Sequence, residues 1–234
     1  MKNTLYALGL LLLITACGEE TTENTMTVSG TVKGLKKGTL YLQHVPDSTL
    51  VTLDSLQING DGSFNFQTEL ESPEIFYLYL NKKDNNDIND RITFFGEPGN
   101  IVIRTAWNTF DTNAKITGSV AHDTYTEYKK YMTVINKRSL EILQKGYNSE
   151  TPLDSLQLDS LERLSNRNTQ RGYLAAINFS INNKDSYVAP YIAVSEIANA
   201  NVKYLDSINN SLTPEVANSK YGKKLKQHIA ELKK

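Results

Sequence analysis

The chain of 234 residues is nearly neutral, with 25 Lys and Arg against 26 Asp and Glu, and it contains one cysteine. A single cysteine excludes an internal disulfide framework, a C-x-x-C redox pair and a four-cysteine zinc site. The formal charge of −1 argues against a nucleic-acid partner, because binding by counterion release needs an excess of Lys and Arg. With 39% hydrophobic residues the chain can bury a core, so general disorder is not expected.

Residues 1–16 have the form of a secretory signal peptide. One charge, on Lys2, precedes an apolar run from Leu5 to Ile14. This run fits the roughly 7 to 15 apolar residues of such a signal and is too short for a membrane-spanning helix of roughly 20. It leads into Ala16-Cys17, which resembles the lipobox of bacterial lipoproteins, whose cysteine is acylated and becomes the first residue after cleavage. We therefore expect lipidation at Cys17, with an incidental or buried thiol as the alternative.

Residues 17–25 are polar and acidic, which predicts a flexible tether between the lipid and the fold. One acyl chain anchors a protein only marginally, so durable attachment needs several chains on Cys17. Glu19 and Glu20 resemble an export signal that some Gram-negative groups use for the outer leaflet of the outer membrane; a solvated spacer explains them equally well. We expect a protein anchored to the outer membrane of a Gram-negative envelope, facing the periplasm or the surface.

Residues 26–118 carry the pattern of short strands separated by turns. Apolar and polar residues alternate in runs such as Val28 to Val32, and Gly-rich or Asn-rich turns separate the runs. The apolar phase slips near Asp54, which predicts a β-bulge. The run from Ile75 to Leu80 is apolar on both faces, which predicts a central strand covered on each side. The count and spacing of about eight strands predict an antiparallel β-sandwich.

Residues 119–234 have few glycines and apolar residues at helical spacing, so the whole chain is predicted to be α+β, with the sandwich followed by a helical region. One helix is expected from Ser119, as its N-cap, to about Lys145, and a second from about Asp154 to Asn182. The first helix is expected to bury a stripe made of Tyr128, Tyr131, Met132, Ile135, Leu140 and Leu143.

Two prolines mark further helix starts. Pro190 fits the first turn of a third helix, because a proline in mid-helix costs about 3 kcal/mol. Thr213-Pro214-Glu215 combines a hydroxyl cap, a proline and a carboxylate, and predicts a last helix that reaches Leu232.

The near-zero total charge hides an asymmetry between the two halves. Residues 17–118 carry a balance of −6 and residues 119–234 one of +4. Together with the two-faced strand, these opposite signs predict that the helices pack on the sheet. Six lysines lie within 220–234, and this basic end favours a solvated helix face, with anionic head groups or an acidic partner as the alternative.

Catalytic and metal-binding patterns are not found in the sequence. His44, His122 and His228 lie in three predicted elements and lack the spacing that puts two imidazoles on one metal. The chain also lacks a G-x-S-x-G elbow, a P-loop and a G-x-G-x-x-G turn. We therefore expect no enzymatic activity, no cofactor and no metal. His44 is expected to be a satisfied histidine at a sheet edge, and His122 to be exposed in the first turn of a helix.

Two weaker patterns leave alternatives open. Asp84, Asp87 and Asp90 alternate with asparagines and resemble a calcium loop, but the central glycine and terminal glutamate of an EF-hand are missing, which favours a polar hairpin tip. A set of aromatic residues would either belong to the core or line a groove between the sandwich and the helices. These are Tyr77, Tyr79, Trp107, Phe110, Tyr125 and Tyr128.

The order of these features resembles a β-rich domain of unknown function. The stretches that carry the resemblance are Val28-x-Gly30-x-Val32, Thr39-Leu40-Tyr41-Leu42, Leu53-Asp54-Ser55, Gly62-x-Phe64-x-Phe66, Phe76-Tyr77-Leu78-Tyr79, Gly96-x-x-Gly99-Asn100-Ile101 and, in the helical part, Ser219-x-Tyr221-Gly222-x-x-Leu225. Such a domain typically opens lipoprotein thiol-disulfide oxidoreductases of the thioredoxin-like superfamily, in which a helical segment joins it to the thioredoxin domain.

The resemblance does not carry the redox activity with it. The sequence ends at Lys234, about where a thioredoxin domain would begin, and attack on a disulfide needs a thiolate and normally a resolving thiol. The sequence therefore predicts a lipid-anchored envelope protein that acts as a non-enzymatic binding or scaffold module, attached to the membrane through Cys17. The alternative is an accessory partner of a separately encoded thioredoxin-like oxidoreductase.

Overall fold

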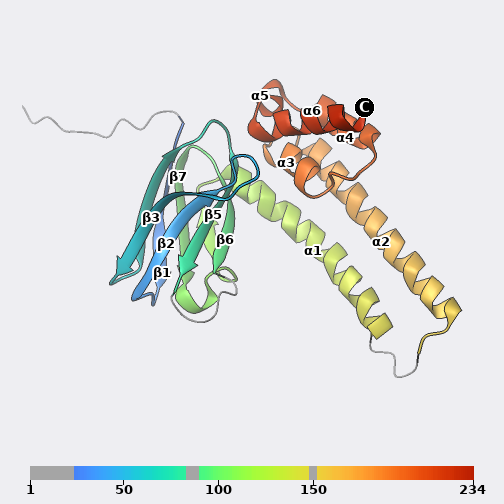
Figure 1. The fold of residues 1–234 in the computed structure, drawn as a ribbon, viewed down its shortest axis with the longest axis horizontal. Helices are drawn as coiled ribbons and strands as arrows, with labels where there is room; N and C mark the ends of the chain where they lie inside the picture. The colour runs from blue at the N-terminus through green and yellow to red at the C-terminus, as the bar shows by residue number, and fades with distance from the viewer. Residues whose placement is uncertain (1–23, 83–89, 148–151) are drawn as a thin grey trace, which may run out of the picture.

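The structure, a computed structural model, describes residues 24–82, 90–147 and 152–234. The predicted signal peptide, most of the predicted tether and Cys17 lie outside the described residues. The first strand begins at Thr25, the last residue of the predicted tether, and residues 25–117 build the sandwich before the helices follow (Figure 1).

Two four-stranded sheets form the sandwich. One has the order β4-β1-β7-β8, with β4 at Ser63–Glu69, β1 at Thr25–Lys33, β7 at Gly99–Ala106 and β8 at Lys115–Thr117. The other has the order β3-β2-β5-β6, with β3 at Val51–Asn59, β2 at Lys37–His44, β5 at Glu74–Asn81 and β6 at Arg91–Gly96. A single 3-10 turn, η1 at Trp107–Thr109, follows β7. The predicted α+β class is confirmed.

The prediction of a purely antiparallel sandwich was wrong for one strand pair. β1 and β7 run parallel, whereas the other paired strands of the described sheets are antiparallel. This pair is close, because a Cβ at Gly30 would lie 1.8 Å from the carbonyl oxygen of Ile103. The predicted bulge is confirmed: the register passes from Leu42–Asp54 to Gln43–Thr52, so β3 holds one extra residue there.

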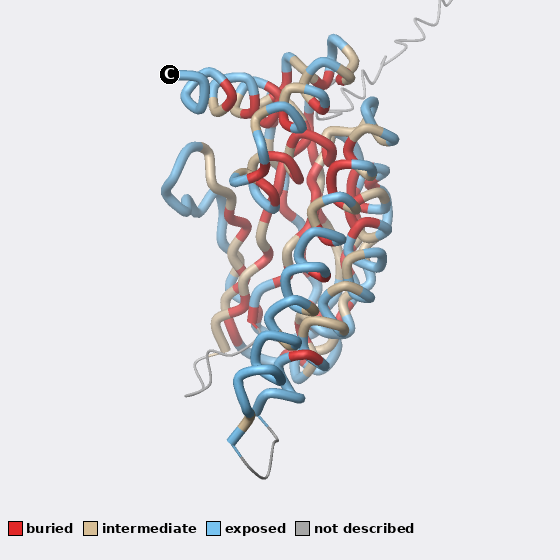
Figure 2. Tube along the Cα trace, turned by 90° about the vertical axis from the view of Figure 1, so that its right-hand side faces the viewer, coloured by how far each residue is buried: buried red, intermediate tan, exposed pale blue. Residues whose placement is uncertain are grey.

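The first apolar core lies between the two sheets, and buried positions recur along the strands in Figure 2. Aromatic rings from both sheets fill it, among them Phe66 from β4, Phe76 from β5 and Phe94 from β6. The rings of Phe76 and Phe94 stack with their centroids 5.9 Å apart. Strands of alternating sequence therefore bury one face here and leave the other polar.

In the described residues six helices follow the sandwich. α1 and α2 form a long antiparallel hairpin, with α1 at Val120–Tyr147 and α2 at Ser155–Asn182. Four shorter helices gather at one end of the sandwich, beside the start of α1 (Figure 1), and are α3 at Val188–Ser195, α4 at Val202–Ser211, α5 at Pro214–Ala217 and α6 at Lys220–Leu232. None of the helices in the described ranges is long and apolar enough to span a bilayer.

The first two helices begin as the sequence predicted. The Ser119 hydroxyl accepts a hydrogen bond from the His122 amide at 2.9 Å and donates one to the Phe95 carbonyl at 3.0 Å, so the cap also joins α1 to β6. Asp154 caps α2 in a capping box with Gln157. Pro190 lies in the first turn of α3, as predicted.

The predicted last helix was wrong, because it is broken in two, and α4 was not predicted. Thr213-Pro214 opens the short α5, and the chain then turns so that Ser219 caps α6, with its hydroxyl accepting from the Gly222 amide at 3.2 Å. A Cβ at Gly222 would lie 2.3 Å from the Val216 carbonyl oxygen, so this glycine permits the close turn between the two helices.

The predicted buried stripe of α1 was also wrong in part. Tyr128 is buried and Met132 packs against the helical core. Tyr131, Leu140 and Leu143 instead expose 60%, 55% and 69% of their surface. Leu140 and Leu143 are exposed because α1, at 28 residues or about 42 Å, extends past the shorter helices, and its far half has only α2 beside it (Figure 1).

The second apolar core joins the helices to one sheet. Ile75 from β5 and Phe95 from β6 belong to the same buried cluster as the helical residues. The ring of Phe95 meets those of Tyr125, Tyr191 and Tyr221 edge to face, with centroids 6.0, 5.6 and 6.1 Å apart. Each such pair contributes about 0.5 to 1.5 kcal/mol beyond the burial of its area. The sheet therefore has one core on each side of β5, as the two-faced strand predicted.

Candidate functional site

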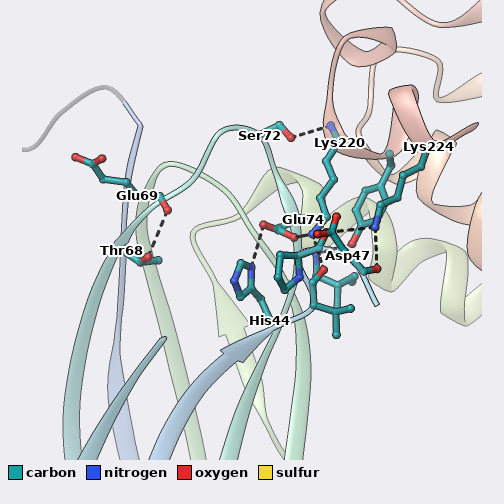
Figure 3. Close-up of polar contacts among 12 residues, drawn as sticks. His44, Asp47, Thr68, Glu69, Ser72, Glu74, Lys220 and Lys224 are labelled. Carbon is teal, nitrogen blue, oxygen red and sulfur yellow. Dashed lines mark hydrogen bonds and ion pairs between the residues drawn. The ribbon is translucent and has the colours of Figure 1, made fainter. Parts of the chain in front are cut away.

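A charged cluster lies where the sandwich meets α6. We call His44, Glu74, Lys220 and Lys224 the junction cluster (Figure 3). His44 ends β2, Glu74 begins β5, and the two lysines lie on the first turns of α6. Backbone pairing brings the ends of β2 and β5 together, since His44 is the register partner of Phe76.

Glu74 is the centre of the junction cluster. It is 92% buried, with 8% of its surface exposed. One carboxylate oxygen lies 3.2 Å from Nδ1 of His44, and the other forms an ion pair with Nζ of Lys220. The imidazole of His44 stacks on the ring of Phe76 at 5.5 Å, nearly parallel to it. Both oxygens of a buried carboxylate thus have cationic or hydrogen-bonding partners, which burial of a charge requires.

The two lysines also bind backbone carbonyls of the loop after β2. Lys220 Nζ donates to the Val45 carbonyl at 2.6 Å. Lys224 Nζ lies 3.3 Å from the Pro46 carbonyl and 3.2 Å from that of Asp47. α6 therefore holds this loop through its lysine side chains, one helical turn apart.

Hydrogen bonds join the start of α6 to the start of β5 and to the loop just before it. The Lys220 amide donates to the Ser72 hydroxyl at 3.1 Å, and the Ile75 amide donates to the Tyr221 hydroxyl at 3.1 Å. Burial raises the pKa of Tyr221, against the opposing effect of the Ile75 hydrogen bond. Tyr221 therefore remains a neutral phenol that accepts a backbone hydrogen bond within the second core.

Two clefts flank the segment 70–73 at this junction. One, of about 440 Å³, is lined by the junction cluster with Glu69, Glu71 and Lys223. Beside this cleft, the Thr68 hydroxyl donates to the Glu69 carbonyl at 3.3 Å (Figure 3). The other cleft, of about 530 Å³, is also lined by acidic and basic side chains, among them Glu97, Glu215 and Lys223. In that cleft the Glu97 carboxylate accepts from the Ala121 amide at 3.1 Å and so stabilises the start of α1.

The geometry of the junction cluster favours attachment over catalysis. Its carboxylate is saturated by His44 and Lys220, and both lysines are directed to carbonyl oxygens of the chain. Within residues 24–82, 90–147 and 152–234, no three His, Cys, Asp or Glu side chains come together as a metal site. The cluster fixes α6 to the ends of β2 and β5.

The three histidines of the chain lie in different parts of the structure. His44 is satisfied, as predicted, but β2 is an inner strand, so it lies at a strand end and not at a sheet edge. His228 interacts through Nε2 with the Ala198 carbonyl at 2.8 Å. The prediction for His122 was wrong: it is buried, and its Nδ1 accepts from the Phe95 amide at 3.3 Å. The backbone of β6 at the sheet edge is satisfied by an imidazole in place of another strand.

The pKa of His122 is lowered, mainly by burial. Burial lowers the pKa of the imidazole to about 4, with a further decrease from the charge of Lys129 and an opposing effect of Asp123. Burial also lowers the pKa of Lys129, whose ammonium group lies 4.5 Å from the centre of the Tyr125 ring. His122 is therefore neutral at physiological pH and acts as a hydrogen-bond acceptor between the two halves.

Of the aromatic residues considered for a groove, Tyr77, Tyr125 and Tyr128 pack together in the helical core, and the other three lie elsewhere. Phe110 belongs to the sandwich core, whereas Tyr125 and Tyr128 belong to the helical core. Tyr79 stacks with Tyr41 on the outer face of the second sheet at 5.8 Å. Trp107 is 45% exposed. The reading of these residues as a single binding groove was wrong.

The remaining charged patterns have local explanations where the structure describes them. Asp84 and Asp87 lie outside the described residues, while Asp90 is buried and paired with Lys82. In the basic end, Lys220 and Lys224 bind the sandwich. Lys233 forms an ion pair of 2.6 Å with Asp206. Much of the predicted basic face is thus used within the chain.

In the comparison with known proteins, one family model matches the sandwich and the first turns of α1. Residues 26–125 match a domain of unknown function, DUF4369. The match ends at Tyr125, so it includes the cap residue Ser119 and, on α1, His122 and Tyr125, all of which contact Phe95 of β6. No curated protein and no solved structure matches the chain.

Loss of one partner from the junction cluster should destabilise the whole chain. Lys220→Met leaves a buried carboxylate with His44 alone, and we expect the free energy of unfolding to fall by about 3 kcal/mol. Adding Glu74→Leu to that variant should recover most of the loss, since an apolar pair needs no charge compensation. Lys223→Met, on an exposed position of the same helix, is the control and should change stability by less than about 0.5 kcal/mol. Equal effects of the two lysine substitutions in urea unfolding would contradict the assignment.

The buried imidazole should make stability depend on pH in the acidic range. The unfolded chain binds the proton near pH 6.5 and the folded chain only near 4, so stability is full above 6.5 and is lost as the pH falls toward 4. The loss attributable to His122 is at most about 3 kcal/mol. His122→Gln keeps an acceptor for the Phe95 amide without titrating, so its unfolding free energy should fall less between pH 7 and pH 4.5. Parallel curves for the two proteins would show that His122 is not the group responsible.

Proposed function

We propose that this protein is a lipid-anchored component of the bacterial cell envelope that acts as a non-enzymatic binding or scaffold module. The anchor is the acylated Cys17, the sandwich with α3 to α6 is the rigid base, and the α1–α2 hairpin is the binding element. The observation that carries the binding role is the distribution of exposed apolar side chains. Nine of the fifteen large apolar side chains that are exposed in the described chain lie on this hairpin.

The position of the anchor supports this arrangement. From Cys17 to the start of β1 at Thr25 the chain has eight residues, which reach at most about 28 Å. β1 starts opposite the end of β4, at Glu69, which is the end of the sandwich that also carries α5 and α6 (Figure 1). The hairpin extends from that end toward the other. A membrane would therefore lie within reach of the junction.

The chemistry of the described side chains supports a role without catalysis. The buried charged groups are engaged in pairs, Glu74 with Lys220 at the junction and Asp90 with Lys82, and His122 is used as a structural acceptor. The apolar side chains on α1 and α2, in contrast, are exposed to solvent. Contiguous exposed apolar side chains on a folded protein mark interaction surfaces. Binding through the hairpin is thus better supported than chemistry at the junction.

The resemblance to the N-terminal domain of thioredoxin-like oxidoreductases gives the proposal its alternative. In that case the bound protein would be a separately encoded thioredoxin-fold enzyme, and the present chain would hold or orient it. Purification from native membranes distinguishes the two, since a stoichiometric thioredoxin-fold protein would select the accessory role.

The anchor makes a direct prediction. Cys17→Ser removes the only thiol that signal processing of a lipoprotein can acylate, so the variant should remain unprocessed or appear in the soluble envelope fraction. It should also lose a metabolic fatty-acid label that the wild-type chain carries. Label retained in Cys17→Ser, or membrane attachment unchanged by it, would contradict the lipoprotein assignment.

A further inference from the structure

We propose that the exposed face of the α1–α2 hairpin binds a second copy of this chain, in an antiparallel pair related by a two-fold axis. The inference rests on the proposed binding role of the hairpin and names its occupant. The face centres on a groove of about 720 Å³ between α1 and α2, lined by Tyr131, Val134, Ile135, Leu174 and Ala175 among others.

The apolar side chains of this face are available for contact. Tyr131 is 60% exposed, Val134 69% and Leu174 50%. No residue of the described chain covers them, although their neighbours Ile135 and Ala175 contribute to the packing between the two helices. A contiguous apolar floor of this kind would be stabilised by removal from water, at about 25 cal/mol per Å².

The groove lining also includes the cations Lys130 and Arg171, but two charges along one stripe of α1 complement each other in an antiparallel pair. Glu127, Tyr131, Val134 and Arg138 follow one another at spacings of four, three and four residues, and therefore lie along one stripe of the helix. An antiparallel copy centred between Tyr131 and Val134 places Glu127 opposite Arg138 of the second copy and Tyr131 opposite its Val134. The two-fold axis repeats both contacts, so each pair forms twice. A parallel copy would place Glu127 opposite Glu127.

Leu174 of α2 lies at the level of the same two-fold axis. Asn168 donates to the Ile135 carbonyl at 2.9 Å, and the rings of Tyr128 and Phe179 lie 5.3 Å apart. These contacts fix the level of the two helices, and they place Leu174 beside the midpoint of Tyr131 and Val134. In the antiparallel pair Leu174 therefore lies close to Leu174 of the second copy.

The existing partners of these charges do not oppose the pairing. Glu127 has no ion pair with any residue in the described ranges. Arg138 lies 2.8 Å from Glu141, but both side chains are about half exposed, so that pair contributes little and can be shared. The contact spans about 16 Å of helix, and confinement of both copies to one membrane raises their effective concentration. With both hairpins lying parallel to the membrane, the two-fold axis is perpendicular to it and both anchors can insert in the same bilayer.

Cysteine cross-linking in membranes tests the pairing, because Cys17 is the only native cysteine. We expect Leu174→Cys in the full-length chain to form a disulfide-linked dimer on mild oxidation, since the two sulfurs meet at the axis. Thr169→Cys, an exposed position on another face of α2, is the matched control and should remain monomeric. The wild-type chain shows whether Cys17 contributes any link.

Charge reversal separates this geometry from unspecific association. Glu127→Arg and Arg138→Glu, each added to Leu174→Cys, should reduce the cross-linked fraction about fivefold or more, because two exposed pairs become repulsive. The double reversal should restore it. An absent dimer in Leu174→Cys, or a dimer that ignores both reversals, overturns the second copy as occupant. A link from position 174 to a different protein overturns it as well while supporting the binding function, and soluble Cys17→Ser protein remains the separate test of the anchor.

Discussion

The contact of Phe95 and Ile75 with the helical core is the constraint on which the rest of the structure depends. β6 is the edge strand of its sheet in the described part of the chain, and its backbone is completed by Ser119 and His122 at the start of α1. The aromatic rings of α1, α3 and α6 then enclose Phe95. A sandwich of two sheets thus becomes a three-layer unit at one end, and the helices cannot be removed without exposing that layer.

The junction cluster acts on the same boundary with a different kind of interaction. Burial of apolar surface supplies most of the attraction between the halves, whereas the Glu74 to Lys220 pair specifies where α6 begins relative to β5. Buried pairs of this kind often add little net stability but penalise any other placement of the helix. The far half of the hairpin receives neither contribution from the sandwich, which explains why apolar residues such as Leu140 and Leu143 remain exposed there.

The sequence predicted the features that depend on local pattern. Alternation and turns gave the strands, the slip near Asp54 gave the bulge, and caps at Ser119 and Asp154 gave the helix starts. The errors concern contacts between distant segments. Burial of His122 depends on Phe95, 27 residues away, and Glu74 meets Lys220 across 146 residues, so neither position carries a local signal. The exposed stripe of α1 has the same apolar spacing as a buried one, and only the length of the neighbouring helices distinguishes them.

Unfolding followed by two probes tests most directly whether the sandwich and the helices form one cooperative unit. Trp107, the only tryptophan, lies beside Gly34 in the sandwich, so its fluorescence reports that half. Circular dichroism at 222 nm reports the helices. We expect both signals from the mature chain to change at one urea concentration and with one slope, as a two-state transition requires. Two separated midpoints would show that the halves are independent domains and would contradict the central role of the Phe95 layer.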